Sequence, residues 1–225
     1  MEAAALFLLV GAGVAIVAYL RYQARQTRIH SVAALAQRTG CTFSRDDVDH
    51  VVDRPFKLFS EGDGRRVELV ISGTHNGLPL RLFDYWYYDQ DSDGQGDVSR
   101  SYHRFTCGLL TIPAACPPLH LAHEDFLTRL GDHLGVHDVE LEYDDFNRRF
   151  RVKCGEQKFA FALLDGQMMQ WLLEAGAFES VEVVGPWILL AGKRLEPARW
   201  LELGAWLDQF HAHVPPVVYT TYPPR

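Results

Sequence analysis

The residues with the most informative chemical spacing are acidic ones in the segment 89–97. Carboxylates occupy positions one, three, five and nine of a calcium-loop pattern, at Asp89, Asp91, Asp93 and Asp97. Alternating residues in such a loop aim their oxygens at one point, and Gly94 stands where the sharp turn requires glycine. Position twelve, normally a bidentate glutamate, is Arg100, and the flanks resemble strands. The segment therefore predicts a solvated hairpin loop, with a divalent-metal site for Ca²⁺ as the alternative and no other cofactor.

Other spacings that could support chemistry are weaker. Three histidine pairs could supply nitrogen ligands to zinc, namely His120 and His123, His133 and His137, and His211 and His213, but no H-E-x-x-H pattern is present. The chain contains neither a G-x-S-x-G nucleophile turn nor a G-x-x-x-x-G-K-[ST] phosphate loop. We therefore expect surface histidines and no catalytic residue, and a hydrolase with an unrecognised site is the alternative.

A run of aromatic residues surrounds one acid at Phe83–Tyr88. The simplest interpretation of Asp84 is a hydrogen-bond acceptor at a strand end. Tyr85, Trp86 and Tyr87 are most simply part of the core or of a sheet face. If they are exposed instead, they form a binding surface, because tyrosine and tryptophan carry much of the binding energy at protein interfaces.

The first element along the chain is an uncharged apolar run from Ala3 to Leu20. A helix of about 20 apolar residues crosses the hydrocarbon core of a membrane, since each residue adds about 1.5 Å. Basic residues follow on one side only, at Arg21, Arg25 and Arg28. By the positive-inside rule, the N-terminus lies outside and the remaining chain lies in the cytoplasm. The sequence thus predicts a single-pass protein of the cell membrane with a transmembrane helix.

The charge and cysteine content of the rest of the chain exclude some classes of binding partner. The 225 residues carry a formal net charge of −7, and without Glu2 and the three arginines 19 basic and 28 acidic residues remain. An acidic domain lacks the basic footprint that nucleic acid requires, and an anionic leaflet repels it. We therefore expect no nucleic-acid partner and no broad contact with the membrane surface. None of the four cysteines forms a C-x-x-C pair, which favours free thiols in a reducing cytoplasm.

Hydrophobic periodicity and turn residues predict an α+β domain with a mostly antiparallel sheet and packed helices. Asn76-Gly77 is a strong hairpin signal, because both residues tolerate positive φ. We expect a three-stranded meander over 66–72, 78–88 and 101–112, further hairpins over 149–163 and 181–191, and helices after Asp165 and from Pro197. The predicted divisions are a membrane anchor with its basic flank (1–29), a soluble domain (30–214, which could divide near 118) and an irregular tail (215–225).

The segment Val139–Val152 resembles a signature, Glu-x-x-x-Phe-Asn-x-x-Phe-x-Val, of an uncharacterised bacterial family of membrane-anchored proteins with a domain of unknown function. The segments 160–164 and 167–173 stand where that family has an Ala-x-x-Leu-Leu step and a Met-rich helix, and segments 59–62 and 83–85 are also similar. The resemblance implies an N-terminal membrane anchor and a soluble α+β domain, and no known catalytic residue. We expect its residues to be structural: Phe146, Asn147, Phe150 and Val152.

These observations favour a non-enzymatic interaction or sensing module, tethered to the membrane on its cytoplasmic side. Tethering would raise the effective concentration of the domain near membrane partners, so we expect the membrane and a protein partner within it. The alternatives are a divalent-metal-binding module at segment 89–97 and the unrecognised hydrolase.

Overall fold

The computed structural model describes the chain except residues 1, 93–97, 124–125, 127–136, 176–177 and 225, and it describes the side chains of the N-terminal helix from Gly11 onward. Within these residues the fold is α+β, and seven strands form one sheet whose pairs are all antiparallel. The strands are β1 (Thr42–Asp46), β2 (Gly64–His75), β3 (Leu78–Ser92), β4 (Val98–His123), β5 (His137–Asp138), β6 (Phe150–Cys154) and β7 (Ser180–Lys193).

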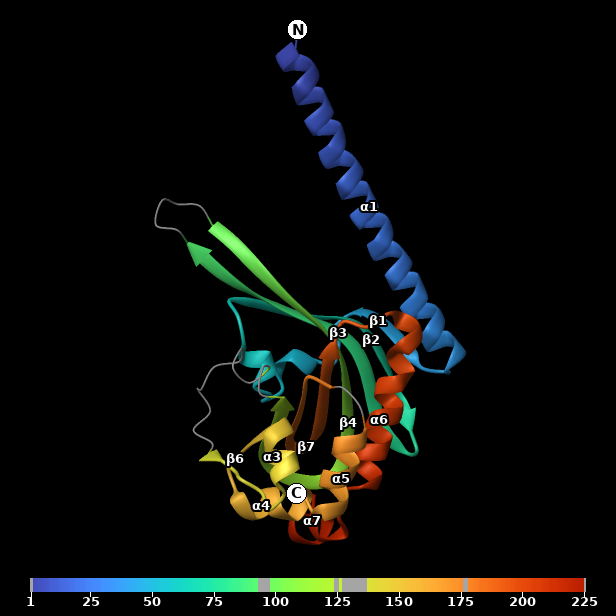
Figure 1. Cartoon of the computed structure of the whole chain (residues 1–225). Helices are drawn as coiled ribbons and strands as arrows, with labels where there is room; N and C mark the ends of the chain where they lie inside the picture. Colours follow the sequence, from blue (N-terminus) through green and yellow to red (C-terminus); the bar gives the residue numbers. More distant parts are fainter. Residues whose placement is uncertain (1, 93–97, 124–125, 127–136, 176–177, 225) are drawn as a thin grey trace.

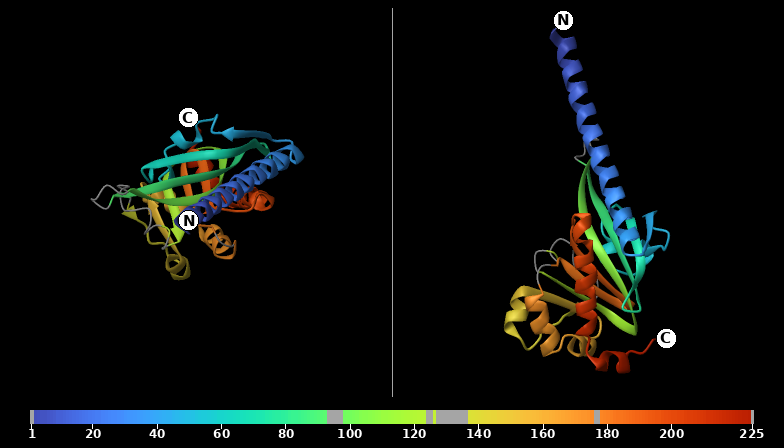
Figure 2. Two further views of the ribbon diagram at one scale, coloured as in Figure 1. Left: turned by 90° about the horizontal axis from the view of Figure 1, so that it is seen from above. Right: turned by 90° about the vertical axis from the view of Figure 1, so that its right-hand side faces the viewer.

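The described helices differ greatly in length. They are α1 (Glu2–Arg38), α3 (Asp144–Arg149), α4 (Gln157–Leu163), α5 (Gly166–Glu174), α6 (Trp200–Ala212) and α7 (Pro216–Thr221), with 3₁₀ turns η1 (Val51–Asp53), η2 (Leu58–Ser60) and η3 (Pro197–Arg199). Helices α3 to α7 lie together on the sheet domain, whereas the N-terminal part of α1 projects beyond it as an isolated rod (Figure 1). The side view in Figure 2 shows the same projection.

Strand β4 is the central element of the sheet. Its first half pairs with β3, its last residues pair with β6 on the same edge, and β7 pairs along the opposite edge. The prolines at 113–118 therefore do not end the strand but coincide with register shifts against β7. The prediction of a division near 118 is wrong, because β4 crosses that position and pairs with β7 on both sides of it.

Two predicted hairpins and the predicted irregular tail are also wrong. Segment 158–163 belongs to α4, where Phe159, Ala160 and Leu163 are buried on one helical face. Segment 181–191 is one strand, since Gly185, with φ 56°, forms an irregularity opposite Cys116 instead of a turn. Residues 216–221 form α7, which buries Val218.

Local turn and capping signals in the sequence are confirmed. Asn76 and Gly77 join β2 to β3 with φ values of 49° and 81°. The Asp165 carboxylate caps α5 by accepting the Met168 N–H at 2.8 Å. The predicted apolar face of α6 is buried on the sheet at Trp200, Leu203, Leu207 and Phe210, and Val214, just after the helix, is also buried. All four cysteines are free thiols.

Helix α1 has two halves with different surroundings. Its C-terminal half buries Ile29, Val32 and Leu35 against the domain, at helical spacing, and the helix ends at Arg38, two residues before Gly40 in the left-handed region. Before this half, residues 11–20 are all exposed, including the apolar Val14, Ile16, Val17, Tyr19 and Leu20. Among the residues with described side chains, no helix is both long and apolar enough to cross a membrane.

Candidate functional site

The alternation of β2, β3 and β4 places three rows of polar and aromatic residues on the sheet face next to α1. Side chains two apart on a strand share a face, and the register aligns them across strands. The rows are Glu68–Asp84–Thr106, then Arg66–Trp86–Arg104, then Gly64–Tyr88–Tyr102. The face therefore changes from a buried acidic end through a cationic row to an aromatic end.

The buried end holds a network that fastens α1 to the domain. Arg28, in α1, donates two hydrogen bonds to the Asp84 carboxylate, at 2.6 and 2.7 Å, and a third to the Leu195 carbonyl at 2.8 Å. Thr106 Oγ1 donates to the same carboxylate at 3.1 Å and accepts the Leu195 N–H at 2.9 Å. Arg194 is a further donor at 3.4 Å. We call this network the α1 latch; Asp84, only 2% exposed, lies in mid-strand and not at a strand end as predicted.

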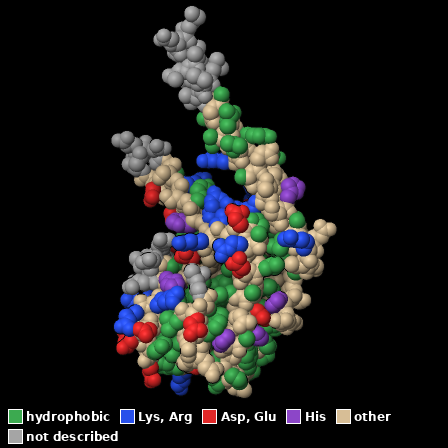
Figure 3. All heavy atoms as spheres, turned by 45° about the vertical axis from the view of Figure 1, so that its right-hand side comes forward, with side chains coloured by type: hydrophobic (Ala, Val, Ile, Leu, Met, Phe, Trp, Pro, Cys, Tyr) green, Lys and Arg blue, Asp and Glu red, His purple; other side chains and the backbone are tan. Residues whose placement is uncertain are grey.

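A cleft of about 700 Å³ opens beside the latch, between α1 and the sheet. Trp86 and Tyr102 line it from β3 and β4, with their ring centroids 5.6 Å apart. Glu68 lines it from β2, and arginines line it from α1, the sheet and the segment after β7: Arg21, Arg25, Arg28, Arg66, Arg104 and Arg194. Figure 3 shows Lys and Arg side chains gathered where α1 meets the sheet, with a few acidic ones between them. We call this the arginine cleft.

The predicted aromatic binding surface is only partly exposed. Tyr85 and Tyr87 are 1% and 3% exposed and pack with Phe59 and Phe105 in the core, so they form no binding surface. Trp86 faces the opposite side of the sheet and lines the arginine cleft. Sequence reasoning missed Arg66, Arg104 and Arg194, because the first two lie beside Trp86 through the register of β2 and β4 with β3, which the alternation within one strand does not specify.

The predicted calcium loop lies partly outside the described residues. Asp93 and Asp97 fall in segment 93–97, of which nothing is described. Asp89 and Asp91 lie on β3, and the Asp89 carboxylate pairs with His103 at 3.0 Å. Among the described residues, no group of three or more His, Cys, Asp or Glu side chains could hold a metal ion. The metal site stays a prediction.

The signature segment forms a packed turn at the sheet edge. Phe146 and Phe150 are buried with ring centroids 4.9 Å apart, and Val152 is buried on β6. The Asn147 amide accepts the Leu141 N–H at 3.1 Å and donates to the Leu141 carbonyl at 2.6 Å. These contacts hold the segment before α3 in place and bury Phe146, Phe150 and Val152, whereas Asn147 is half-buried.

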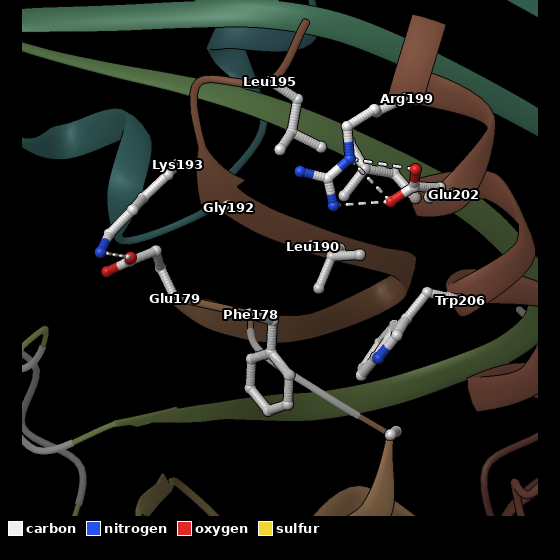
Figure 4. Close-up of a pocket in the computed structure, with 11 residues that line it drawn as sticks. Phe178, Glu179, Leu190, Gly192, Lys193, Leu195, Arg199, Glu202 and Trp206 are labelled. Carbon is white, nitrogen blue, oxygen red and sulfur yellow. Dashed lines mark hydrogen bonds and ion pairs between the residues drawn. The ribbon is translucent and has the colours of Figure 1, made fainter.

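Another cavity, of about 550 Å³, lies between β7, α6 and the end of α5 (Figure 4). Its wall is largely apolar, with Phe178, Leu190, Leu195, Leu203 and Trp206. Its charged side chains pair with one another: Lys193 lies 3.9 Å from Glu179 and Arg199 lies 2.8 Å from Glu202. Because these charges are matched locally, the cavity lacks the excess charge of the arginine cleft, which we take as the candidate site.

Comparison with known proteins gives one informative likeness. No family model matches the chain, and no curated protein matches it. The crystal structure of the mycobacterial trehalose monomycolate transport factor A, TtfA, is similar, with a TM-score of 0.59 and 14% sequence identity. The similarity covers 84% of this chain and 97% of that one. At this identity the likeness shows a shared fold alone.

A buried titratable pair lies on the far side of the sheet from α1. His120 and Glu182 oppose each other on β4 and β7 and are 4% and 3% exposed. Burial raises the pKa of Glu182 to about 7, although its carboxylate accepts the N–H groups of Lys57 and Leu58 at 2.6 and 2.9 Å. Burial, followed by the charges of Lys153 and Lys57, lowers the pKa of His120 to about 3.

The two groups should give opposite pH dependences of stability. Folded Glu182 keeps its proton up to about pH 7, so its stabilisation is present below pH 4.5 and is lost as the pH rises through 7. Compared with Glu182→Gln, the wild type should therefore lose about 3 kcal/mol of unfolding free energy between pH 4.5 and 8. Urea titrations at both pH values measure this change, and a pH-independent difference would contradict it.

His120 should give the opposite pH dependence of stability. Its folded imidazole stays neutral down to about pH 3, so its stabilisation is present above pH 6.5 and is lost as the pH falls. Compared with His120→Asn, the wild type should lose about 3 kcal/mol of unfolding free energy as the pH falls from 7.5 to 4.5.

Proposed function

We propose that this protein is a non-enzymatic module that α1 anchors in the cell membrane and that acts on membrane partners from the cytoplasmic side. The observation that carries the proposal is the division of α1 into two halves. The exposed half belongs to an uncharged apolar run that begins at Ala3, before the described side chains, and ends at Leu20. Such a run is suited to lipid, because water gives no compensation for exposing it on every side.

The α1 latch supports a rigid form of tethering. The Arg28 side chain is 10% exposed and the side chain of its bidentate partner Asp84 is 3% exposed, so the helix is fastened to the sheet only eight residues after the apolar run. A flexible linker would let the domain diffuse around its anchor. A continuous helix with a buried ion pair instead holds one face of the domain, which carries the arginine cleft, toward the membrane.

The fold comparison is compatible with such a role. TtfA is named as a transport factor for trehalose monomycolate. A tethered module that assists a membrane transport process is one form of the proposed function. The relation to the uncharacterised bacterial family, the cytoplasmic location and the protein partner are likewise proposals, supported by the sequence.

Labelling of tagged protein in intact cells tests the orientation. A tag after Arg225 should react with an impermeant reagent only after the cells are permeabilised, whereas a tag before Met1 should react in intact cells. Reaction of the C-terminal tag from outside would reverse the topology and refute a cytoplasmic role.

A further inference from the structure

The arginine cleft has more positive charge than its acidic neighbours neutralise. Arg25 pairs with Glu68 at 3.2 Å, Arg66 pairs with Asp46 at 2.5 Å, and Arg28 and Arg194 share Asp84. Six arginines thus face three carboxylates, which leaves a net charge of +3. In a chain whose net charge is −7, this is a local concentration of positive charge.

Two of these arginines are available to a ligand. Among the residues that the structure describes, neither Arg21 nor Arg104 pairs with a carboxylate. The Arg104 guanidinium lies 5.4 Å from the centroid of the Tyr102 ring, which orients it without neutralising it. The two side chains line the same cleft from α1 and from β4, so a ligand that fills the cleft would lie between the two elements.

The side chains that line the arginine cleft favour a ligand with a phosphate group. Guanidinium groups bind phosphate oxygens through paired, charge-assisted hydrogen bonds, which Arg forms better than Lys. Trp86 and Tyr102 contribute amphipathic rings, which are enriched at the level of lipid headgroups. An arginine-rich wall next to such rings fits a ligand with a charged phosphate and an apolar part.

The position of the arginine cleft along α1 favours a membrane lipid as the molecule that carries the phosphate group. At about 1.5 Å per residue, Arg21 and Arg25 lie about 2 and 8 Å beyond the end of the apolar run. The headgroup layer of a bilayer extends about 5–8 Å beyond the hydrocarbon core. The cleft therefore opens at headgroup depth if α1 is the anchor, and in this respect the inference rests on the proposed function.

We propose that the arginine cleft binds the phosphate-bearing headgroup of an anionic membrane lipid, with Arg21 and Arg104 as its main ligands. Binding would reverse the expectation, based on net charge alone, that the domain avoids an anionic leaflet. It would also fix the orientation of the domain, because the headgroup would bridge α1 and the sheet beside the α1 latch.

Thermal unfolding of the full chain in nanodiscs tests this proposal. Wild-type protein should melt at a temperature several degrees higher in phosphatidylcholine discs that contain phosphatidylglycerol than in discs of phosphatidylcholine alone. Arg21→Gln/Arg104→Gln should lose this shift, because each contact changes binding by about tenfold or more. Arg38→Gln/Arg45→Gln removes the same charge outside the cleft and should keep the shift.

Each other outcome overturns a defined part of the account. If both double variants lost the rise in melting temperature equally, general surface charge would explain the rise and a specific role of the arginine cleft would be refuted. If inorganic phosphate added to phosphatidylcholine discs raised the melting temperature as much as phosphatidylglycerol does, the ligand would not be a lipid. If neither phosphatidylglycerol nor inorganic phosphate raised the melting temperature, the binding site itself would be refuted. Failure of the chain to enter nanodiscs would refute the anchor, and the lipid source with it, whereas entry without a headgroup-dependent shift would refute the cleft alone.

Discussion

Asp84→Ala should lower the free energy of unfolding by about 3–5 kcal/mol. The substitution removes the bidentate partner of Arg28, whose side chain is 10% exposed, and leaves a buried guanidinium without its counterion. It also removes the acceptor used by Thr106 and Arg194. Urea denaturation of the full chain in detergent measures the change, and hydrogen exchange should show the largest loss of protection in the docked half of α1.

A matched control separates the α1 latch from ordinary surface ion pairs. Asp46 pairs with Arg66 on the same sheet, but the two side chains are 67% and 49% exposed. Asp46→Ala should therefore cost about 1 kcal/mol or less. Replacing both latch partners, in Arg28→Met/Asp84→Leu, should cost less than Asp84→Ala alone, because no charge is then left buried. A cost for Asp84→Ala equal to that for Asp46→Ala would refute the latch.

Phe146→Ala should cost about 3–5 kcal/mol of unfolding free energy. Phe146 is fully buried against Phe150 in the core that also contains residues of α4 and α5, so the truncation leaves a cavity that a close-packed core fills poorly. Thermal and urea unfolding measure the loss. This result would give the signature segment a structural role.

Two further variants serve as comparisons for Phe146→Ala. Phe161→Ala removes the same side chain from an exposed position on α4 and should change stability by less than about 1 kcal/mol. Asn147→Ala should cost about 1–3 kcal/mol, because the Leu141 N–H and carbonyl lose their partner. If Phe146→Ala proved as mild as Phe161→Ala, the segment would instead need a functional explanation.

Local signals predicted the elements whose cause is local. Asn76-Gly77, the Asp165 cap and the apolar face of α6 depend on residues within a few positions of one another, and each is present in the structure. Segments 158–163 and 181–191 were mispredicted because tertiary partners decided their conformation. Gly185-Pro186 resembles a turn in isolation, but pairing with the irregular part of β4 keeps it within one strand.

The candidate site was harder to predict because it is assembled from distant segments. Arg28 and Asp84 are 56 residues apart in sequence, and Arg194 is 110 residues from Asp84. Their meeting depends on the register of β3 with β4 and on the docking of α1, which no local pattern specifies. The net charge of the chain was similarly uninformative, because an acidic chain still gathers six of its arginines around one cleft.

Alkaline carbonate extraction of membranes from cells that produce the full chain tests the anchor most directly. The wild-type protein should remain in the membrane pellet, since carbonate removes only peripheral proteins. Val14→Arg/Val17→Arg should move much of the protein to the supernatant, because each arginine in the apolar run costs about 2.5–3.5 kcal/mol. Val48→Arg, at a 67% exposed position on the domain, should stay in the pellet. Release of the wild-type protein by carbonate would contradict the membrane anchor and the function built on it.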